Sequence, residues 1–401
     1  MSSDPRLIAG IDIGGGRVTC LVGNHNSSTG ALQVLGGAQV ACRGISAGVV
    51  YNRVETFAAI ERALRRAEEQ AGNTVSEAWC GVRGQHLQSF NSKGSFRVGH
   101  TDRPITSTDV DAVIADVSKI ELSRDRQYLH IAPISFIADD RRCVGSPVGV
   151  SGKLLEVDAH LFTASSAHLS NLLKAMPSRI EKVVPMVGQL AAGELLISPE
   201  RKNRGCVLLD IGGQSTLMAA YCDGSIVYSA EIPYGSDLIT RDLAIALKTS
   251  FTSAERLKLN YGISDASAMT DDSGITVSGE DGRPPLRVEP RKLAEVIAPR
   301  LEEIFSMASE KLRDSGYYDV LLPGNAVLTG GGALLRGMCE AAQKYIGMPA
   351  SLGSPTVTLA EKSKQWLSPE YSTALGLLHV SNNPRWGSYA PKRCSQVAPL
   401  I

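Results

Sequence analysis

One short pattern occurs twice in the chain, and its spacing constrains the fold more than any other feature. The first copy is an apolar run that ends in Asp12-Ile13-Gly14-Gly15, followed by a second apolar run from Arg17. The second copy ends in Asp210-Ile211-Gly212-Gly213, and another apolar run returns from Leu217. Such runs, joined by glycines, are typical of strand–turn–strand units. The two aspartates lie 198 positions apart (210 − 12), so the pattern indicates duplication of a whole domain.

A third glycine turn follows later in the chain, where Gly330-Gly331-Gly332 separates a predicted strand at 326–329 from a predicted helix at 334–345. Backbone N–H groups in glycine turns bind anions, and two facing turns can clamp a polyphosphate. Mg²⁺ prefers one or two carboxylates together with water and phosphate oxygens. The three turns therefore predict a nucleotide cleft, with Mg²⁺ held at Asp12 and Asp210 through water.

Composition excludes several other classes of protein. The 41 basic and 41 acidic residues give a formal net charge of zero, which argues against a nucleic-acid-binding protein. The sequence has no apolar stretch long enough to span a membrane and begins with no secretory signal. Its eight cysteines form no C-x-x-C pair and are expected to be reduced structural thiols.

Between the repeated patterns, the periodicity predicts helices and one inserted unit. A helix over 54–71 is expected to bury Val54, Phe57, Ile60 and Leu64. Short strands and a helix over 107–120, capped by Ser107 or Thr108, indicate a small α+β unit inserted between about 78 and 163. Residues 262–290 suggest a surface loop or hairpin. A helix over 291–312 contains Pro299, which predicts a kink or break near Ala298.

Taken together, these motifs resemble the actin/Hsp70/sugar-kinase ATPase fold and, within it, the FtsA family of bacterial cell-division proteins. The resemblance covers roughly residues 5–380 and favours the FtsA family because of Pro147-Val148-Gly149-Val150-Ser151-Gly152 in the inserted unit. The other matching segments are 10–14, 209–213, 232–235, 239–242, 293–300, 327–332 and 371–378.

The resemblance implies an α/β protein of actin-like ATPase fold. Two duplicated ribonuclease-H-like domains would flank a nucleotide cleft, and an FtsA-type α+β subdomain (1C) would be inserted in the first domain. The implied boundaries are 1–80, 164–195 and 375–385 for subdomain 1A, 81–163 for 1C, 196–244 and 319–374 for 2A, and 245–318 for 2B. Residues 386–401 are expected to form a disordered tail.

The implied cofactors are ATP and Mg²⁺. Glu255 and Lys258 match the helix that meets ribose and adenine in this superfamily, although the same spacing also suits an ion pair on a solvated helix face. The implied nucleotide-binding residues are Gly14, Gly15, Gly16, Arg17, Gly212, Gly213, Gln214, Ser215, Gly235, Glu255, Lys258, Gly330, Gly331 and Gly332.

Both phosphate loops depart from the family pattern. Where relatives carry Thr or Ser and then Lys in the first loop, this chain has Gly15 and Arg17. The second loop has Gln214 and Ser215 where Gly and Thr are usual, and Leu217 where an acid is usual. These departures predict nucleotide binding through the backbone with at most slow ATP hydrolysis, and no catalytic residue is assigned.

The family resemblance implies a scaffold that tethers FtsZ filaments to the cytoplasmic membrane and helps assemble the septal ring. It would polymerise with itself, contact other division proteins through 1C, and lie on the cytoplasmic face of the membrane at the division site. The C-terminal tail of FtsZ would bind subdomain 2B, where Arg291, Lys292 and Arg300 are the expected contacts. Trp386 and Tyr389, with nearby basic residues, predict at most weak, salt-sensitive membrane binding.

Two alternatives remain open from the sequence. A PilM-like protein of type IV pilus assembly would share the fold and the inserted unit. A sugar or acetate kinase would need a catalytic carboxylate between the domains, for which the sequence offers no clear candidate.

Overall fold

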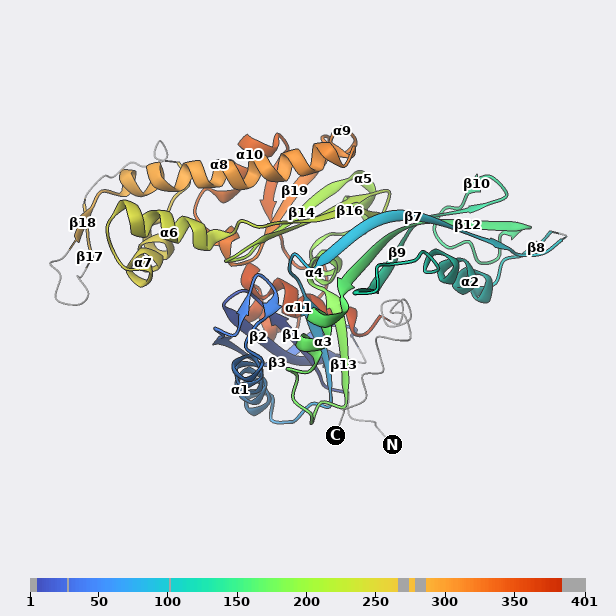
Figure 1. The fold of residues 1–401 in the computed structure, drawn as a ribbon, viewed down its shortest axis with the longest axis horizontal. Helices are drawn as coiled ribbons and strands as arrows, with labels where there is room; N and C mark the ends of the chain where they lie inside the picture. The colour runs from blue at the N-terminus through green and yellow to red at the C-terminus, as the bar shows by residue number, and fades with distance from the viewer. Residues whose placement is uncertain (1–5, 27–28, 101, 266–273, 278–285, 384–401) are drawn as a thin grey trace.

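The structure, a computed structural model, describes residues 6–26, 29–100, 102–265, 274–277 and 286–383. Two five-stranded sheets form the centre of the molecule, and a smaller sheet extends to one side (Figure 1). The first sheet has the order β3 (Leu32–Ala41), β2 (Arg17–His25), β1 (Ile8–Ile13), β6 (Glu77–Val82) and β13 (Lys182–Val187). The second has the order β16 (Ser225–Ile232), β15 (Thr216–Cys222), β14 (Cys206–Ile211), β19 (Asn325–Thr329) and β20 (Ala350–Leu352).

Both large sheets have the same strand directions. In each, the first three strands form an antiparallel meander, and the last two run parallel to the first strand of that meander. β1 and β14 are therefore equivalent strands, and each carries its aspartate next to its carboxyl end. The predicted duplication is confirmed.

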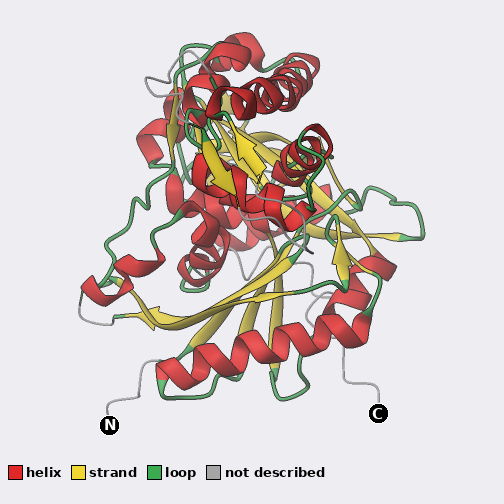
Figure 2. Ribbon diagram, turned by 90° about the vertical axis from the view of Figure 1, so that its left-hand side faces the viewer, coloured by secondary structure: helices red, strands yellow, loops and turns green. Residues whose placement is uncertain are grey.

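Helices cover the sheets in layers because the central strands are apolar on both faces. Along β14, Cys206 and Leu208 face the core shared with the first sheet, whereas Val207 and Leu209 face the opposite core. The helices α4 (Gly188–Leu196) and α11 (Ser372–Val380) pack on each other between the sheets. On the outer face of the first sheet, α1 (Arg53–Ala71) packs against β2 and β3, along the lower side of the molecule in Figure 2.

The buried face of α1 differs from the prediction. Val54 is 77% exposed and Phe57 is 42% exposed, while Ala59, Ile60 and Leu64 are buried. The spacing of the large apolar residues therefore predicted a buried face that is rotated from the observed one. Ala59 and Ala63 are part of the observed face, and their small side chains let the helix approach the sheet closely.

The inserted unit is an antiparallel sheet covered by one helix, so the predicted α+β organisation is confirmed. α2 (Ser107–Val117) packs on β7 (Leu87–Arg97) and β12 (Leu154–Ser165) over a core of its own. The helix begins after Thr106, which forms a capping box with Asp109, and it ends three residues before the predicted limit. The elements are β7 (Leu87–Arg97), β8 (Arg103–Pro104), α2 (Ser107–Val117), β9 (Arg126–Ala138), β10 (Arg141–Arg142), β11 (Ser151–Gly152) and β12 (Leu154–Ser165).

The inserted unit also contacts the second domain along β16. The Asn91 amide Nδ2 donates to the Val227 carbonyl at 2.9 Å, and the Ser89 hydroxyl donates to the Ser229 carbonyl at 3.1 Å. Buried His160 places Nε2 at 2.9 Å from the Ser229 hydroxyl. The insertion therefore touches both halves of the molecule.

A helical region of the second domain lies at the opposite end of the molecule from the inserted sheet (Figure 1). It contains α6 (Ser236–Ala246), α7 (Phe251–Tyr261), the antiparallel strands β17 (Ile275–Val277) and β18 (Leu286–Val288), and α8 (Pro290–Asp314). Of the kink or break predicted near Ala298, the break is wrong, because α8 continues through Pro299. Buried Ile297 and Leu301 on either side of the proline hold the helix against the core.

The predicted helix at 334–345 is also wrong in its start. A 3₁₀ turn covers Gly331–Leu334, and the α-helix α10 covers Met338–Ile346. The other elements are β4 (Ile45–Ser46), β5 (Val49–Val50), α3 (Ser166–Leu173), α5 (Pro199–Arg204), α9 (Tyr318–Leu321) and the 3₁₀ turns Glu361–Trp366 and Pro369–Tyr371. Among the described residues, no helix is long and apolar enough to span a membrane. The predicted tail at 386–401 lies outside the described residues.

Candidate functional site

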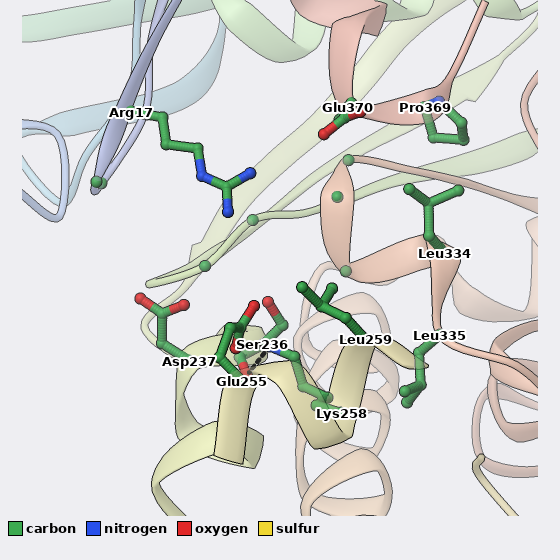
Figure 3. A pocket seen from close by; sticks show the side chains of 18 of the residues that line it. Arg17, Ser236, Asp237, Glu255, Lys258, Leu259, Leu334, Leu335, Pro369 and Glu370 are labelled. Carbon is green, nitrogen blue, oxygen red and sulfur yellow. Dashed lines mark hydrogen bonds and ion pairs between the residues drawn. The ribbon is translucent and has the colours of Figure 1, made fainter. Parts of the chain in front are cut away.

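A cleft of about 610 Å³ lies where the two domains meet. Its walls are the β1–β2 turn, the β14–β15 turn, the glycine turn after β19, and the facing sides of α6 and α7. Figure 3 shows Arg17 reaching into this space from one side, with Glu255 and Lys258 of α7 on another.

The two strand turns at the cleft have matching geometry. In the first, Gly14 N–H donates to the Arg17 carbonyl at 2.9 Å; in the second, Gly212 N–H donates to the Ser215 carbonyl at 2.9 Å. In each turn, the donor glycine lies two residues after the aspartate of its repeat. The duplication thus places two equivalent glycine turns across one cleft.

The third turn packs directly on the second. Gly330 has φ +83°, and a Cβ there would lie 2.4 Å from Oδ1 of Asp210, so only glycine fits. Gly331 is different, because the nearest atom to a Cβ there is 3.9 Å away, on Glu370. Gly331 therefore borders open space in the cleft.

Most of the predicted nucleotide-binding residues line the cleft, but Gln214, Ser215 and Gly235 do not. The Gln214 side chain instead crosses to the first domain, where its Oε1 accepts from Ala47 N–H at 2.5 Å. Gly235 is packed against the Gly213 carbonyl. The lining residues are Gly14, Gly15, Gly16, Arg17, Gly212, Gly213, Glu255, Lys258, Gly330, Gly331 and Gly332.

Lys258 is buried rather than part of a solvated helix face. Its ammonium donates to Thr240 Oγ1 at 2.8 Å and to the Ser236 carbonyl at 3.1 Å, and it pairs with Glu255 Oε2 at 2.7 Å. These three partners use all three donors of the ammonium. Lys258 therefore fixes α7 to α6 at the wall of the cleft.

The cleft also contains apolar residues that the sequence analysis missed. Leu259 on α7 and Leu334 and Leu335 beside the third turn line it, and Figure 3 shows them near one another below Pro369. A planar base fits an apolar slot of this kind better than a sugar phosphate does. Their positions next to predicted site residues were the only signal in the sequence.

Arg83 is the most important residue that the sequence analysis missed. Its Nη2 donates to Asp12 Oδ1 at 3.1 Å and to Asp210 Oδ2 at 3.3 Å. Arg83 directly follows β6, which runs parallel to β1, so both strands end at the same edge of the sheet. A boundary at residue 81 would put position 83 in the inserted unit, whereas Arg83 directly follows a strand of the first sheet and lines the cleft.

Charges within this cluster perturb one another. Burial raises the pKa of Asp12; Arg83 opposes this rise and Asp210 adds to it. Burial would lower the pKa of Arg83, but Asp12, Asp210 and Glu231 together raise it above its ordinary value. The guanidinium is therefore charged wherever the protein is folded.

The predicted Mg²⁺ site does not fit this arrangement. The guanidinium bonds to an oxygen of each aspartate and would repel a second cation placed between them. In the described part of the chain, no cluster of three or more metal-binding side chains offers a replacement. Asp12 and Asp210 are close together as expected, but with an arginine between them.

The three partner residues predicted on α8 differ in exposure and in their ion pairs. Arg291 and Lys292 are exposed at the start of the helix. The Arg300 guanidinium instead forms a two-pronged pair with Asp242 of α6, with Nε–Oδ2 2.7 Å and Nη2–Oδ1 3.1 Å, and it also pairs with Glu303. Arg300 therefore holds α8 to α6 and is not a free cation for a peptide.

Comparison with solved structures shows a fold shared with actin-like proteins. A chain of the PilM–PilN type IV pilus biogenesis complex matches with a TM-score of 0.65 at 18% identity, covering 94% of this chain and 98% of that chain. MreB5 of Spiroplasma citri bound to ADP matches with a TM-score of 0.53 at 12% identity, covering 95% and 98%. At these identities the likeness shows the fold alone, so the pilus alternative has only structural similarity in its favour.

Sequence comparison is more specific. The family model for cell division protein FtsA matches residues 207–376, and the model for the SHS2 domain inserted in FtsA matches residues 84–163. The cell division protein FtsA of Pseudomonas aeruginosa is 32% identical over 93% of this chain and 88% of its own length. That of Neisseria meningitidis is 32% identical over 95% and 91%, and that of Escherichia coli is 28% identical over 94% and 91%. The chain belongs to the FtsA family of actin-like cell division proteins.

Proposed function

We propose that this protein binds ATP in the cleft between its two domains and acts as a nucleotide-binding scaffold in cell division. The observation that supports this most directly is the pair of equivalent glycine turns, at Gly14 and Gly212, which line one cleft together with the third turn. The apolar slot at Leu259, Leu334 and Leu335 suits the base.

Family membership supports a further proposal for the partners and the location. We propose that the scaffold links FtsZ filaments to the cytoplasmic face of the membrane at the division site, assembles with copies of itself, and contacts other division proteins through the inserted subdomain. The start of α8, with exposed Arg291 and Lys292, is the proposed contact for an acidic tail peptide of FtsZ. The subdomain boundaries given by the sequence remain part of this proposal, with Arg83 moved from the inserted unit to the cleft.

Nucleotide binding is tested at Gly331, which borders open space and whose φ tolerates a side chain. Gly331→Val fills part of the cleft and is expected to weaken ATP binding at least about tenfold, or about 1.4 kcal/mol. Gly331→Ala, the matched control, adds one methyl group and is expected to weaken binding less. Gly213 is a poorer test site, because a Cβ there lies 2.8 Å from the Asp237 carboxylate and would disturb the fold directly.

Isothermal titration calorimetry with ATP measures this series. Equal affinity in the wild type, Gly331→Ala and Gly331→Val would place the nucleotide elsewhere. If the wild type binds no ATP, the proposal that this protein is a nucleotide-binding scaffold is wrong.

A further inference from the structure

The ion cluster at the base of the cleft joins the two domains through one nitrogen atom. Arg83 Nη2 donates to Asp12 of the first domain and to Asp210 of the second. All three side chains are largely buried, with 9% of Arg83, 14% of Asp12 and 4% of Asp210 exposed. The Thr373 hydroxyl also donates to Asp210 Oδ2, at 3.3 Å, so this oxygen already has two donors.

The Arg83 side chain lines the cleft beside the second glycine turn. Nη1 lies 3.5 Å from the position that a Cβ of Gly212 would occupy, beside the second glycine turn. Buried Nε has no hydrogen-bond partner among the described residues. A guanidinium presents a planar fork of donors that matches phosphate oxygens, and it stays charged at every physiological pH.

We propose that the guanidinium of Arg83 takes the place of a divalent cation in this cleft, so that the polyphosphate of the nucleotide binds without a metal. The proposal rests on the proposed function for the identity of the ligand, but its central claim concerns the cluster itself. Arg83 offsets one of the two negative charges of the aspartates, and its guanidinium lines the cleft where those carboxylates would otherwise repel the phosphates.

The first test compares ATP binding to the wild-type protein in EDTA and in excess MgCl₂ by calorimetry. We expect the affinity in EDTA to equal or exceed that in MgCl₂. A divalent cation that bridged protein and phosphate would strengthen ATP binding by attracting the phosphate oxygens. An affinity that rises more than about tenfold on adding Mg²⁺ would therefore overturn the proposal.

The second test needs no nucleotide and follows thermal unfolding with MgCl₂ or with NaCl at equal ionic strength. For the wild type, we expect the two salts to give the same melting temperature. Arg83→Gln leaves Asp12 and Asp210 facing each other without a counter-charge, so its melting temperature should fall, and MgCl₂ should restore part of the loss. Arg97→Gln, on exposed β7, is the control and should show no specific response to Mg²⁺.

The two tests separate the two proposals. If the wild type binds no ATP in either buffer, the proposed function fails, and the unfolding experiment alone decides the role of Arg83. If Arg83→Gln does not fold, the melting temperature of the wild type still tests the proposal. A higher melting temperature in MgCl₂ than in NaCl would show that the cluster accepts a metal, and the proposal would be wrong.

Discussion

Acid is expected to loosen the inserted subdomain, because three buried histidines lie in it or beside it. Burial lowers the pKa of His160 to about 3 and of His130 to about 4. Burial, with nearby His168 and Arg126, lowers the pKa of His86 to about 4. His130 must be neutral at Nε2, because that nitrogen accepts from Val187 N–H at 3.2 Å.

The sign and size of the effect follow from proton linkage. An unfolded histidine takes up its proton near pH 6.5, whereas these folded ones do so only near pH 3 or 4, so falling pH favours the unfolded chain between these values. At about pH 5, each histidine costs about 2 kcal/mol of stability. The summed cost of the three histidines is comparable to the free energy of unfolding of many domains, about 5–15 kcal/mol. Above about pH 7.5 the cost disappears.

Hydrogen exchange measured by mass spectrometry at about pH 7.5 and pH 5, corrected for the intrinsic rate, resolves where the loss occurs. Peptides from β7, β9 and β12 should lose protection first. His130→Gln keeps an acceptor for Val187 N–H and should lose about 2 kcal/mol less on acidification. His100→Gln, at an exposed position, is the control and should behave like the wild type. Equal acid responses of wild type and His130→Gln would refute the reasoning.

Three further predictions concern the Arg300 ion pairs, the start of α8 and the phosphate loops. Arg300→Gln removes the pair with Asp242 and should destabilise the protein by about 1 kcal/mol in calorimetric unfolding, whereas the control Lys292→Gln should not. Lys292→Glu should weaken the binding of an FtsZ tail peptide, measured by fluorescence anisotropy. Unchanged peptide affinity would move the peptide site away from α8. With Leu217 in place of an acid, phosphate release from ATP should stay below about 1 s⁻¹ in a colorimetric assay, and faster release would reveal a catalytic group outside the predicted set.

The fold was predictable where local signals agree. Apolar strands, glycine turns and the aspartate at the same place in each repeat were enough to predict the duplication, the cleft and the insertion. Long-range side-chain pairings were not. Arg83 meets carboxylates 71 and 127 positions away, Gln214 reaches 167 positions back to Ala47, and Arg300 pairs across 58 positions. No periodicity records such pairs, because they depend on how finished elements pack.

The contact between the inserted subdomain and β16 has a consequence for solubility. β16 is the edge strand of the second sheet, and an uncovered edge can pair with a strand of another chain. Asn91 and Ser89 bond to the Val227 and Ser229 carbonyls of this edge, so those acceptors are not open to a foreign strand. Removing residues 84–163 would strip this cover. Such a truncated chain would then aggregate because the edge of β16 is exposed, even if its two large domains fold correctly.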